Sequence, residues 1–283
     1  MSDTLAADAY SRRDLWLCLA RAFGKPAGDA FRDVFAQHLA DDLKAIAEET
    51  GLVAHEDIAA LRRDAARLGN DLDLLRLYSK LFIAPPTPVV LNAGFYMDGG
   101  KSGQIEQELR AIYARHGVAK NADMRDFYDA VPLQLEFLSF LYGRAGDYAK
   151  AAQNMEARAY MAEAEAFIAR YPVQWCTPFL RDLEKACADD GLNRAYEHLA
   201  RILWLAVEQA RAGAPIEALP AGAGLPQGSS RGLGDVTAQD LAEVAYRLEQ
   251  AGLAWDHVAA NEAWSDAVFT ARRALGDTDA VRA

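Results

Sequence analysis

The stretch DFYDAVPLQLEFLSFLY, residues 126–142, carries the apolar pattern that decides the fold. At about 100° per residue, one group of its apolar side chains falls on a single face of a helix, as expected for a face in a protein core. That group consists of Val131, Leu135, Leu138 and Tyr142. A second face carries Asp129, Leu133, Glu136 and Phe140. The stretch therefore predicts a helix with one core face and one face that combines carboxylates with apolar groups.

Outward from this stretch, apolar residues recur at helical spacing in both directions. Helices are predicted over residues 8–23, 29–50, 55–68, 70–82, 103–116, 126–142, 148–170, 174–189 and 192–212. Asp29 and Asn70 stand where N-caps would be. The pattern predicts an all-α fold, with a single helical-bundle domain over residues 1–212.

Two segments rich in proline and glycine interrupt the helical pattern. Residues 83–103 predict an ordered loop packed on the body, because their apolar content is high and so long a loop in a compact domain is usually functional or disordered. Residues 213–236 are too poor in apolar groups to order themselves and predict a linker. Residues 237–283 predict a C-terminal helical extension. Such a linker can permit domain swapping, which leaves a homo-oligomer open.

The charge of the chain points away from nucleic acid. Its 41 acidic and 30 basic side chains give a formal net charge of −11, and no cluster of Lys and Arg provides the basic patch that a phosphate backbone needs. An acidic surface steers cationic partners, including peptides that contain arginine. The alternative is that the negative charge only keeps the protein soluble.

The cysteines and the terminal segment indicate a cytoplasmic protein. Cys18, Cys176 and Cys187 form no CxxC pair, which argues against a disulfide framework or a zinc site. The N-terminus has no positive region followed by an apolar one, so no signal peptide is expected. No apolar run approaches the roughly 20 residues that cross a bilayer. We therefore expect no stable membrane insertion.

Catalytic and metal-binding signatures are absent from the sequence. HExxH, GxSxG and EF-hand patterns are missing, and the five histidines lie at spacings that make no ligand pair. Gly100-Lys101-Ser102 ends like a phosphate-binding loop, but five residues rather than four separate Gly94 from Gly100. Lys101 and Ser102 are therefore weak candidates for nucleotide binding. We expect no metal, no cofactor and no enzymatic activity.

The acidic face of the 126–142 helix is the candidate for binding. Asp129 and Glu136, with Leu133 and Phe140 between and beyond them, would suit a peptide that carries arginines beside hydrophobic residues. The alternative is that Asp129 complements the helix N-terminus while Glu136 is solvated.

Four segments, in this order, carry a resemblance to a known family. They are residues 11–26; residues 77–85 with the following pair Phe95-Tyr96; residues 129–138; and residues 167–179 with the helix that contains Tyr196. The second is similar to the family pattern Tyr-x-x-Leu-Phe-x-x-Pro, and the third to Asp-His-Leu-x-x-Glu-Leu-x-Phe-Met/Leu. Together they resemble the TorD/DmsD/NarJ-type redox-enzyme maturation chaperones. Two departures stand in the third segment, where the His of the family pattern is Ala130 and its first Glu is Gln134.

The resemblance implies a cytoplasmic chaperone without turnover. It would bind the twin-arginine leader or the body of a molybdopterin-dependent oxidoreductase and delay export until the cofactor is inserted. Asp129 and Glu136 would meet the arginines of the leader. An adjoining apolar groove would be lined by Tyr78, Phe82, Pro85, Phe95 and Tyr96, although plain packing of the loop on the body is the alternative for these rings. Two other readings stay open, which are a generic helical adaptor for peptides and a protein that binds GTP or ATP through Gly100-Lys101-Ser102.

Overall fold

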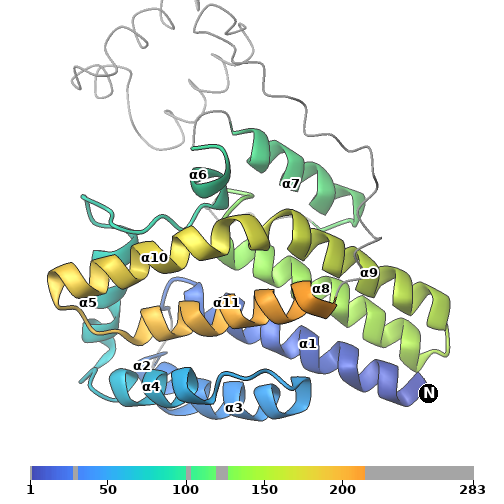
Figure 1. The fold of residues 1–283 in the computed structure, drawn as a ribbon, viewed down its shortest axis with the longest axis horizontal. Helices are drawn as coiled ribbons and strands as arrows, with labels where there is room; N and C mark the ends of the chain where they lie inside the picture. The colour runs from blue at the N-terminus through green and yellow to red at the C-terminus, as the bar shows by residue number, and fades with distance from the viewer. Residues whose placement is uncertain (1, 28–30, 100–102, 119–126, 214–283) are drawn as a thin grey trace, which may run out of the picture. The chain divides into compact units, whose positions relative to one another are not determined.

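The computed structural model describes residues 2–27, 31–99, 103–118 and 127–213, and these residues form an all-α fold (Figure 1). The long helices are α1 (Ser2–Phe23), α3 (Leu39–Thr50), α4 (His55–Ala65), α5 (Asp71–Phe82), α7 (Gln104–Arg115), α8 (Val131–Lys150), α9 (Asn154–Arg170), α10 (Pro172–Asp190) and α11 (Ala195–Gly213). The short ones are α2 (Phe31–Asp33), the π-helix η1 (Val34–His38) and α6 (Ala93–Met97). The predicted cap Asp29, the linker and the C-terminal extension lie outside the described residues.

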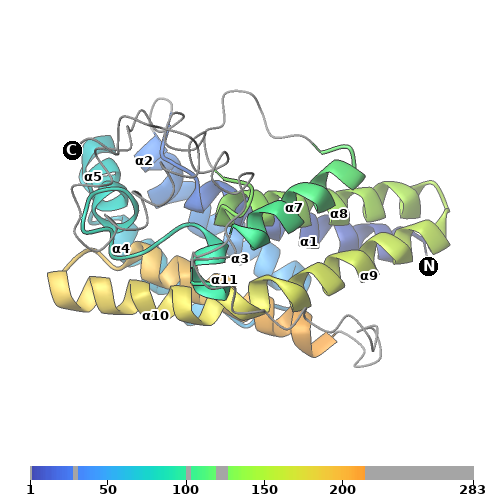
Figure 2. The ribbon, with the colours of Figure 1, turned by 90° about the horizontal axis from the view of Figure 1, so that it is seen from above.

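Helices α1 and α8 form the centre of the bundle and lie side by side along most of their lengths (Figures 1 and 2). Helix α9 packs on α8, α11 packs on α10 and α4, and α3 packs on α1. Two glycines of α8 face α1. A Cβ on Gly146 would lie 2.5 Å from the Tyr10 ring, and one on Gly143 would lie 3.3 Å from Arg13 Cδ. The face of α8 that carries these two glycines therefore allows α1 to approach closely.

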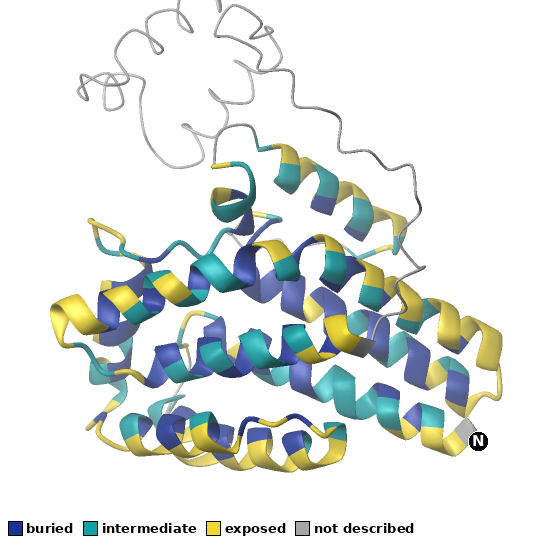
Figure 3. Cartoon of the chain, in the orientation of Figure 1, coloured by how far each residue is buried: buried dark blue, intermediate teal, exposed yellow. Residues whose placement is uncertain are grey.

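The core face predicted for the 126–142 stretch is confirmed. Val131, Leu135, Leu138 and Tyr142 are fully buried and belong to one apolar core that extends through the described bundle (Figure 3). Burial of such side chains is the main favourable contribution to folding.

The boundaries of α8 differ from the predicted ones at both ends of the helix. Helix α8 begins at Val131 and has Pro132 in its first turn, where the missing proline N–H costs no hydrogen bond. It then continues to Lys150, and a turn with Ala152 at φ 59° separates it from α9. The cap at Asn70 is confirmed, because its side chain accepts a hydrogen bond from Asp73 N.

The predicted 29–50 helix is divided into α2, η1 and α3. No proline or glycine between Phe31 and Thr50 marks the division, so the sequence pattern could not reveal it. π-turns inside helices occur often at functional sites. Here η1 carries Val34, which is 57% exposed, and it borders the pocket described below.

Candidate functional site

The carboxylate of Asp129 lies just before α8 and is used inside the protein. Its Oδ1 accepts a hydrogen bond from Asn92 Nδ2 at 2.9 Å, and its Oδ2 accepts one from Gly94 N at 3.0 Å. The side chain is 7% exposed, and a Cβ on Gly94 would lie 2.8 Å from Oδ2. Asp129 therefore fastens the 83–99 loop to the start of α8, a role that neither of the two predicted alternatives described.

Gln134, at the position of the family glutamate, lies fully buried beneath this fastening. Its Nε2 donates to the Asp129 main-chain oxygen at 2.9 Å, and its Oε1 accepts from Trp175 Nε1 at 3.0 Å. An amide can donate and accept at once, whereas an ionised carboxylate can only accept. The glutamine thus suits both of its partners, and Trp175 itself is fully buried.

The other predicted binding residues divide into buried and accessible ones. Tyr78, Phe82 and Leu133 are buried, and Tyr96 is half-buried. The accessible members are Pro85, Phe95 and Glu136, together with the half-buried Phe140. Contact of these residues with a peptide stays a prediction.

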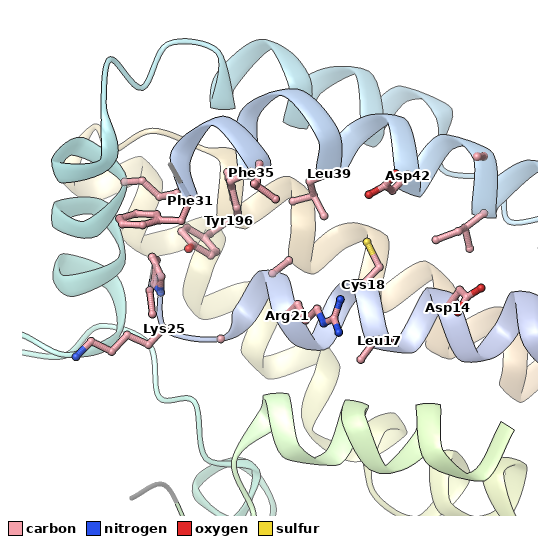
Figure 4. A pocket seen from close by; sticks show the side chains of 18 of the residues that line it. Asp14, Leu17, Cys18, Arg21, Lys25, Phe31, Phe35, Leu39, Asp42 and Tyr196 are labelled. Atoms are coloured by element: carbon pink, nitrogen blue, oxygen red, sulfur yellow. The ribbon is translucent and has the colours of Figure 1, made fainter. Parts of the chain in front are cut away.

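A pocket that the sequence did not indicate lies between α1 and the α2–η1–α3 segment (Figure 4). Its volume is about 630 Å³, within the usual range for ligand pockets of roughly 300–1,000 Å³. Its apolar lining includes Leu17, Phe31, Val34, Phe35, Leu39 and Ile46. Helix α5 contributes Leu74 and helix α11 contributes Tyr196 to the wall, so four segments distant in the sequence build one site.

Charged side chains of both signs also line this pocket, with acidic ones in the majority. The acidic residues are Asp14, Asp42 and Glu49, and the basic ones are Arg21 and Lys25. Glu49 accepts a hydrogen bond from Ser11 Oγ at 2.7 Å, and Asp14 pairs with Arg13 at 2.7 Å. Among the described residues, no side chain forms a hydrogen bond or an ion pair with Asp42. The carboxylate of Asp42 is thus available to a cationic guest.

Arg21 connects the pocket with the predicted face of α8. Partial desolvation by its neighbours raises the pKa of Glu136 although the side chain reaches solvent, and the charge of Arg21 opposes this rise, which places the two groups within electrostatic reach across α1 and α8. Burial, with a smaller contribution from Asp42, also raises the pKa of Cys18 in the pocket wall to about 12. The thiol therefore stays protonated at neutral pH and is a poor nucleophile.

The buried aromatic residues of the family-like motif support the pocket from behind. The ring of Tyr196 packs against Phe82 at 5.2 Å, Phe35 at 5.3 Å and Tyr78 at 5.9 Å between ring centroids. Tyr78 and Phe82 therefore touch the pocket wall without lining the pocket. The Tyr196 hydroxyl has no hydrogen-bond partner among the described residues.

One sequence signal could have located part of this pocket. Asp42, Ala45, Ile46 and Glu49 follow the i, i+3, i+4, i+7 spacing of a single helical face, which again combines carboxylates with apolar groups. Their position opposite Asp14 and Leu17 depends on how α3 packs on α1, and periodicity within one helix does not contain that information.

The described part of the chain lacks two structural features, a cluster of metal ligands and a membrane-spanning helix. Within it, no group of His, Cys, Asp and Glu is placed to hold a metal ion. No described helix is long and apolar enough to cross a membrane. Lys101 and Ser102 lie outside the described residues, so nucleotide binding by them stays a weak prediction.

Comparison with known proteins gives one match. No curated protein and no solved structure matches the chain significantly. Residues 43–181 match the sequence model of the nitrate reductase delta subunit family. The match includes the 83–99 loop, the start of α8 and Trp175, and leaves out α1 and α11. With this match and the all-α fold of the described residues, residues 43–181 are assigned to the nitrate reductase delta subunit family, within the TorD/NarJ-type chaperones that mature molybdenum-dependent redox enzymes.

Proposed function

We propose that the protein is a cytoplasmic chaperone, specific for one client, that binds the leader or the body of a molybdopterin-dependent oxidoreductase and assists cofactor insertion before export. The observation that carries this proposal is the pocket between α1 and α3, which joins an apolar wall to three carboxylates, of which Asp42 is available. A twin-arginine leader offers the matching groups, because it has guanidinium groups next to an apolar stretch.

The acidic side of the pocket favours arginine over lysine. A guanidinium can donate two parallel hydrogen bonds to one carboxylate, whereas an ammonium acts as a point charge. Asp42 is available for such a pair, and Asp14 and Glu49 line the same pocket. The net charge of −11 adds a long-range attraction for a cationic leader.

The residues predicted from the sequence take two roles in this proposal. Glu136, Phe140, Pro85 and Phe95 form accessible contacts for the client outside the pocket. The buried residues hold these surfaces in place, Asp129 by fastening the loop and Tyr78 with Phe82 by supporting the pocket wall.

Calorimetry with two leader peptides tests the proposal. One peptide carries Arg-Arg and the other Lys-Lys in an otherwise identical sequence. We expect the Arg-Arg peptide to bind about tenfold more tightly, as one charge-assisted hydrogen bond contributes about 1.5 kcal/mol. Equal affinities would indicate a generic peptide adaptor, and no binding of either peptide would contradict the proposal.

A charge-matched pair of variants locates the arginine site. We expect Asp42→Asn with Glu49→Gln to abolish the preference for Arg-Arg. The control is Asp3→Asn with Glu156→Gln, which removes the same charge from exposed positions in the first turns of α1 and α9. The control should weaken the binding of both peptides slightly and by the same factor. A preference that survives in the Asp42 variant would place the arginines elsewhere.

A further inference from the structure

The lining of the pocket between α1 and α3 changes character along its length. Figure 4 shows Asp14 and Asp42 at one end, and Phe31, Phe35 and Tyr196 at the other. At 1.5 Å per helical residue, Asp14 and Ala22, the last residue of α1 that lines the pocket, lie roughly 12 Å apart along this helix. This length suits about two turns of a helical guest or about four residues of an extended one. The pocket is therefore long enough to hold two chemically different parts of a peptide.

Both walls of the pocket carry their acidic residues at one end and their aromatic residues at the other. At the acidic end, Ser11 of α1 donates to Glu49 of α3 at 2.7 Å. At the other end, the Tyr196 ring lies 6.3 Å from Phe23 of α1 and 5.3 Å from Phe35 of η1. The chain therefore runs in opposite directions along the two walls, so that acidic residues face acidic residues and aromatic residues face aromatic residues. The change from an acidic to an aromatic lining is thus a property of the whole pocket.

The aromatic end contains an unpaired polar group. Tyr196 is fully buried, and its hydroxyl has no hydrogen-bond partner among the described residues. Burial raises the pKa of this hydroxyl well above its usual value, so it is a neutral donor at any physiological pH. A buried donor without a partner lowers the stability of the free protein. A guest that enters this end would supply the missing acceptor.

We infer that the pocket binds its guest in one direction, with the arginines between Asp14, Asp42 and Glu49 and the apolar stretch against the aromatic end, where the Tyr196 hydroxyl donates to a main-chain carbonyl of the guest. This inference rests on the proposed function and adds the orientation of the leader. An apolar stretch has no side-chain acceptor, so its carbonyl oxygens are the groups that the hydroxyl can meet.

The order of the residues in an export leader matches this orientation. Such a leader has its basic residues before its apolar stretch. Its N-terminal part would therefore lie near Glu49 and its C-terminal part near Tyr196. Lys25, which lines the aromatic end, repels the arginines from that end and complements the free carbonyls of a helical C-terminus. The reverse orientation would place arginines beside Lys25 and leave Asp42 unpaired.

The Tyr196→Phe variant tests the hydrogen bond with two readouts of opposite sign. We expect the affinity for the leader to fall about five- to tenfold, because one hydrogen bond is lost. The free protein should be as stable as the wild type or more stable, because an unpaired buried hydroxyl is removed. The control is Tyr113→Phe, since the Tyr113 hydroxyl is also buried without a partner but does not line the pocket. It should leave the affinity unchanged.

Photo-crosslinking in the full chain tests the direction itself. Leader peptides carry a benzophenone at either the N-terminus or the C-terminus, and mass spectrometry locates the attachment site. The N-terminal probe should label the region around Glu49, and the C-terminal probe the region around Phe31. The reverse pattern, or labelling of both regions by each probe, would overturn the inference. Unchanged affinity in Tyr196→Phe would do the same while leaving the proposed function intact, whereas absence of leader binding to the wild type would remove both.

Discussion

At the scale of single residues, two carboxylates seven positions apart have different tasks. Each oxygen of Asp129 accepts a hydrogen bond from the 83–99 loop, and one of these comes from the buried Gly94 N–H. Glu136 is exposed, and no described side chain forms an ion pair with it. The loss of Asp129 therefore leaves two donors without an acceptor, while the loss of Glu136 leaves none.

We expect Asp129→Ala to reduce the free energy of unfolding by about 2 kcal/mol, because buried donors lose their partners. Glu136→Ala should change it by less than about 0.5 kcal/mol. Urea unfolding followed by circular dichroism measures both values, and the helical signal of the folded state should stay intact. Leader affinity should fall in Glu136→Ala, because the Glu136 carboxylate lies within electrostatic reach of Arg21 of the pocket. Equal stability of the two variants would contradict the fastening role of Asp129.

The different tasks of these residues show where sequence reasoning ends. The apolar pattern correctly placed Val131 and Leu135 in the core, because a single period determines that face. It grouped Asp129 with Glu136 because both fall on one face of an extrapolated helix. The helix begins only at Val131, and the partners of Asp129 are Asn92 and Gly94 at the start of the short helix α6, which the period of the 126–142 stretch does not describe.

At the scale of elements, the contact between α1 and α8 depends on a glycine. A Cβ on Gly146 would lie 2.5 Å from the Tyr10 ring, which is held by a hydrogen bond from its hydroxyl to Asp147 Oδ1 at 2.9 Å. On Gly143, a Cβ would meet only the flexible Arg13 side chain at 3.3 Å. The two positions therefore compare the same substitution with and without a rigid neighbour.

We expect Gly146→Ala to destabilise the protein by about 1 kcal/mol, since overpacking of 1–3 kcal/mol exceeds the helix-propensity gain of about 1 kcal/mol. Gly143→Ala should be neutral or stabilising by up to about 1 kcal/mol. Thermal and urea unfolding measure both. If Gly146→Ala were as stable as Gly143→Ala, the Tyr10 ring would move freely and the close approach of α1 would not depend on this glycine.

The elements were also predictable to different degrees. Each long helix was predicted, because its apolar spacing continues for several turns. The division of residues 29–50 into α2, η1 and α3 was not, since a π-turn leaves no mark in composition. The pocket was missed for a related reason, because it depends on how α3 packs on α1.

At the scale of the whole molecule, a charge cluster joins three helices on the side formed by α4, α10 and α11. Arg201 of α11 lies 2.6 Å from Glu184 of α10, 3.5 Å from Asp57 of α4 and 3.6 Å from Glu197 of its own helix. Glu197 is 1% exposed. One guanidinium therefore compensates carboxylates that come from three elements.

We expect Arg201→Leu to reduce the free energy of unfolding by about 1–2 kcal/mol at pH 7, less than for a fully buried pair because the Arg201 side chain is partly exposed. Urea unfolding measures this loss. The control is Arg211→Leu on the same helix, whose guanidinium pairs with Glu208 at 3.3 Å at the surface. It should cost less than about 0.5 kcal/mol.

The loss in Arg201→Leu should also depend on pH, with a sign that Asp57 determines. Burial raises the pKa of Asp57, and Arg201 is the main group that opposes the rise. Without Arg201 the pKa of the folded state rises further above the unfolded value of about 3.9, so the folded variant holds its proton more tightly. The loss in the free energy of unfolding, relative to the wild type, is then complete above the raised pKa and becomes smaller as the pH falls towards about 3.9. Urea unfolding at pH 7, 5 and 4 should show the free energies of unfolding of the variant and the wild type converging as the pH falls. A difference between them that grows in acid would show that Arg201 does not compensate these carboxylates.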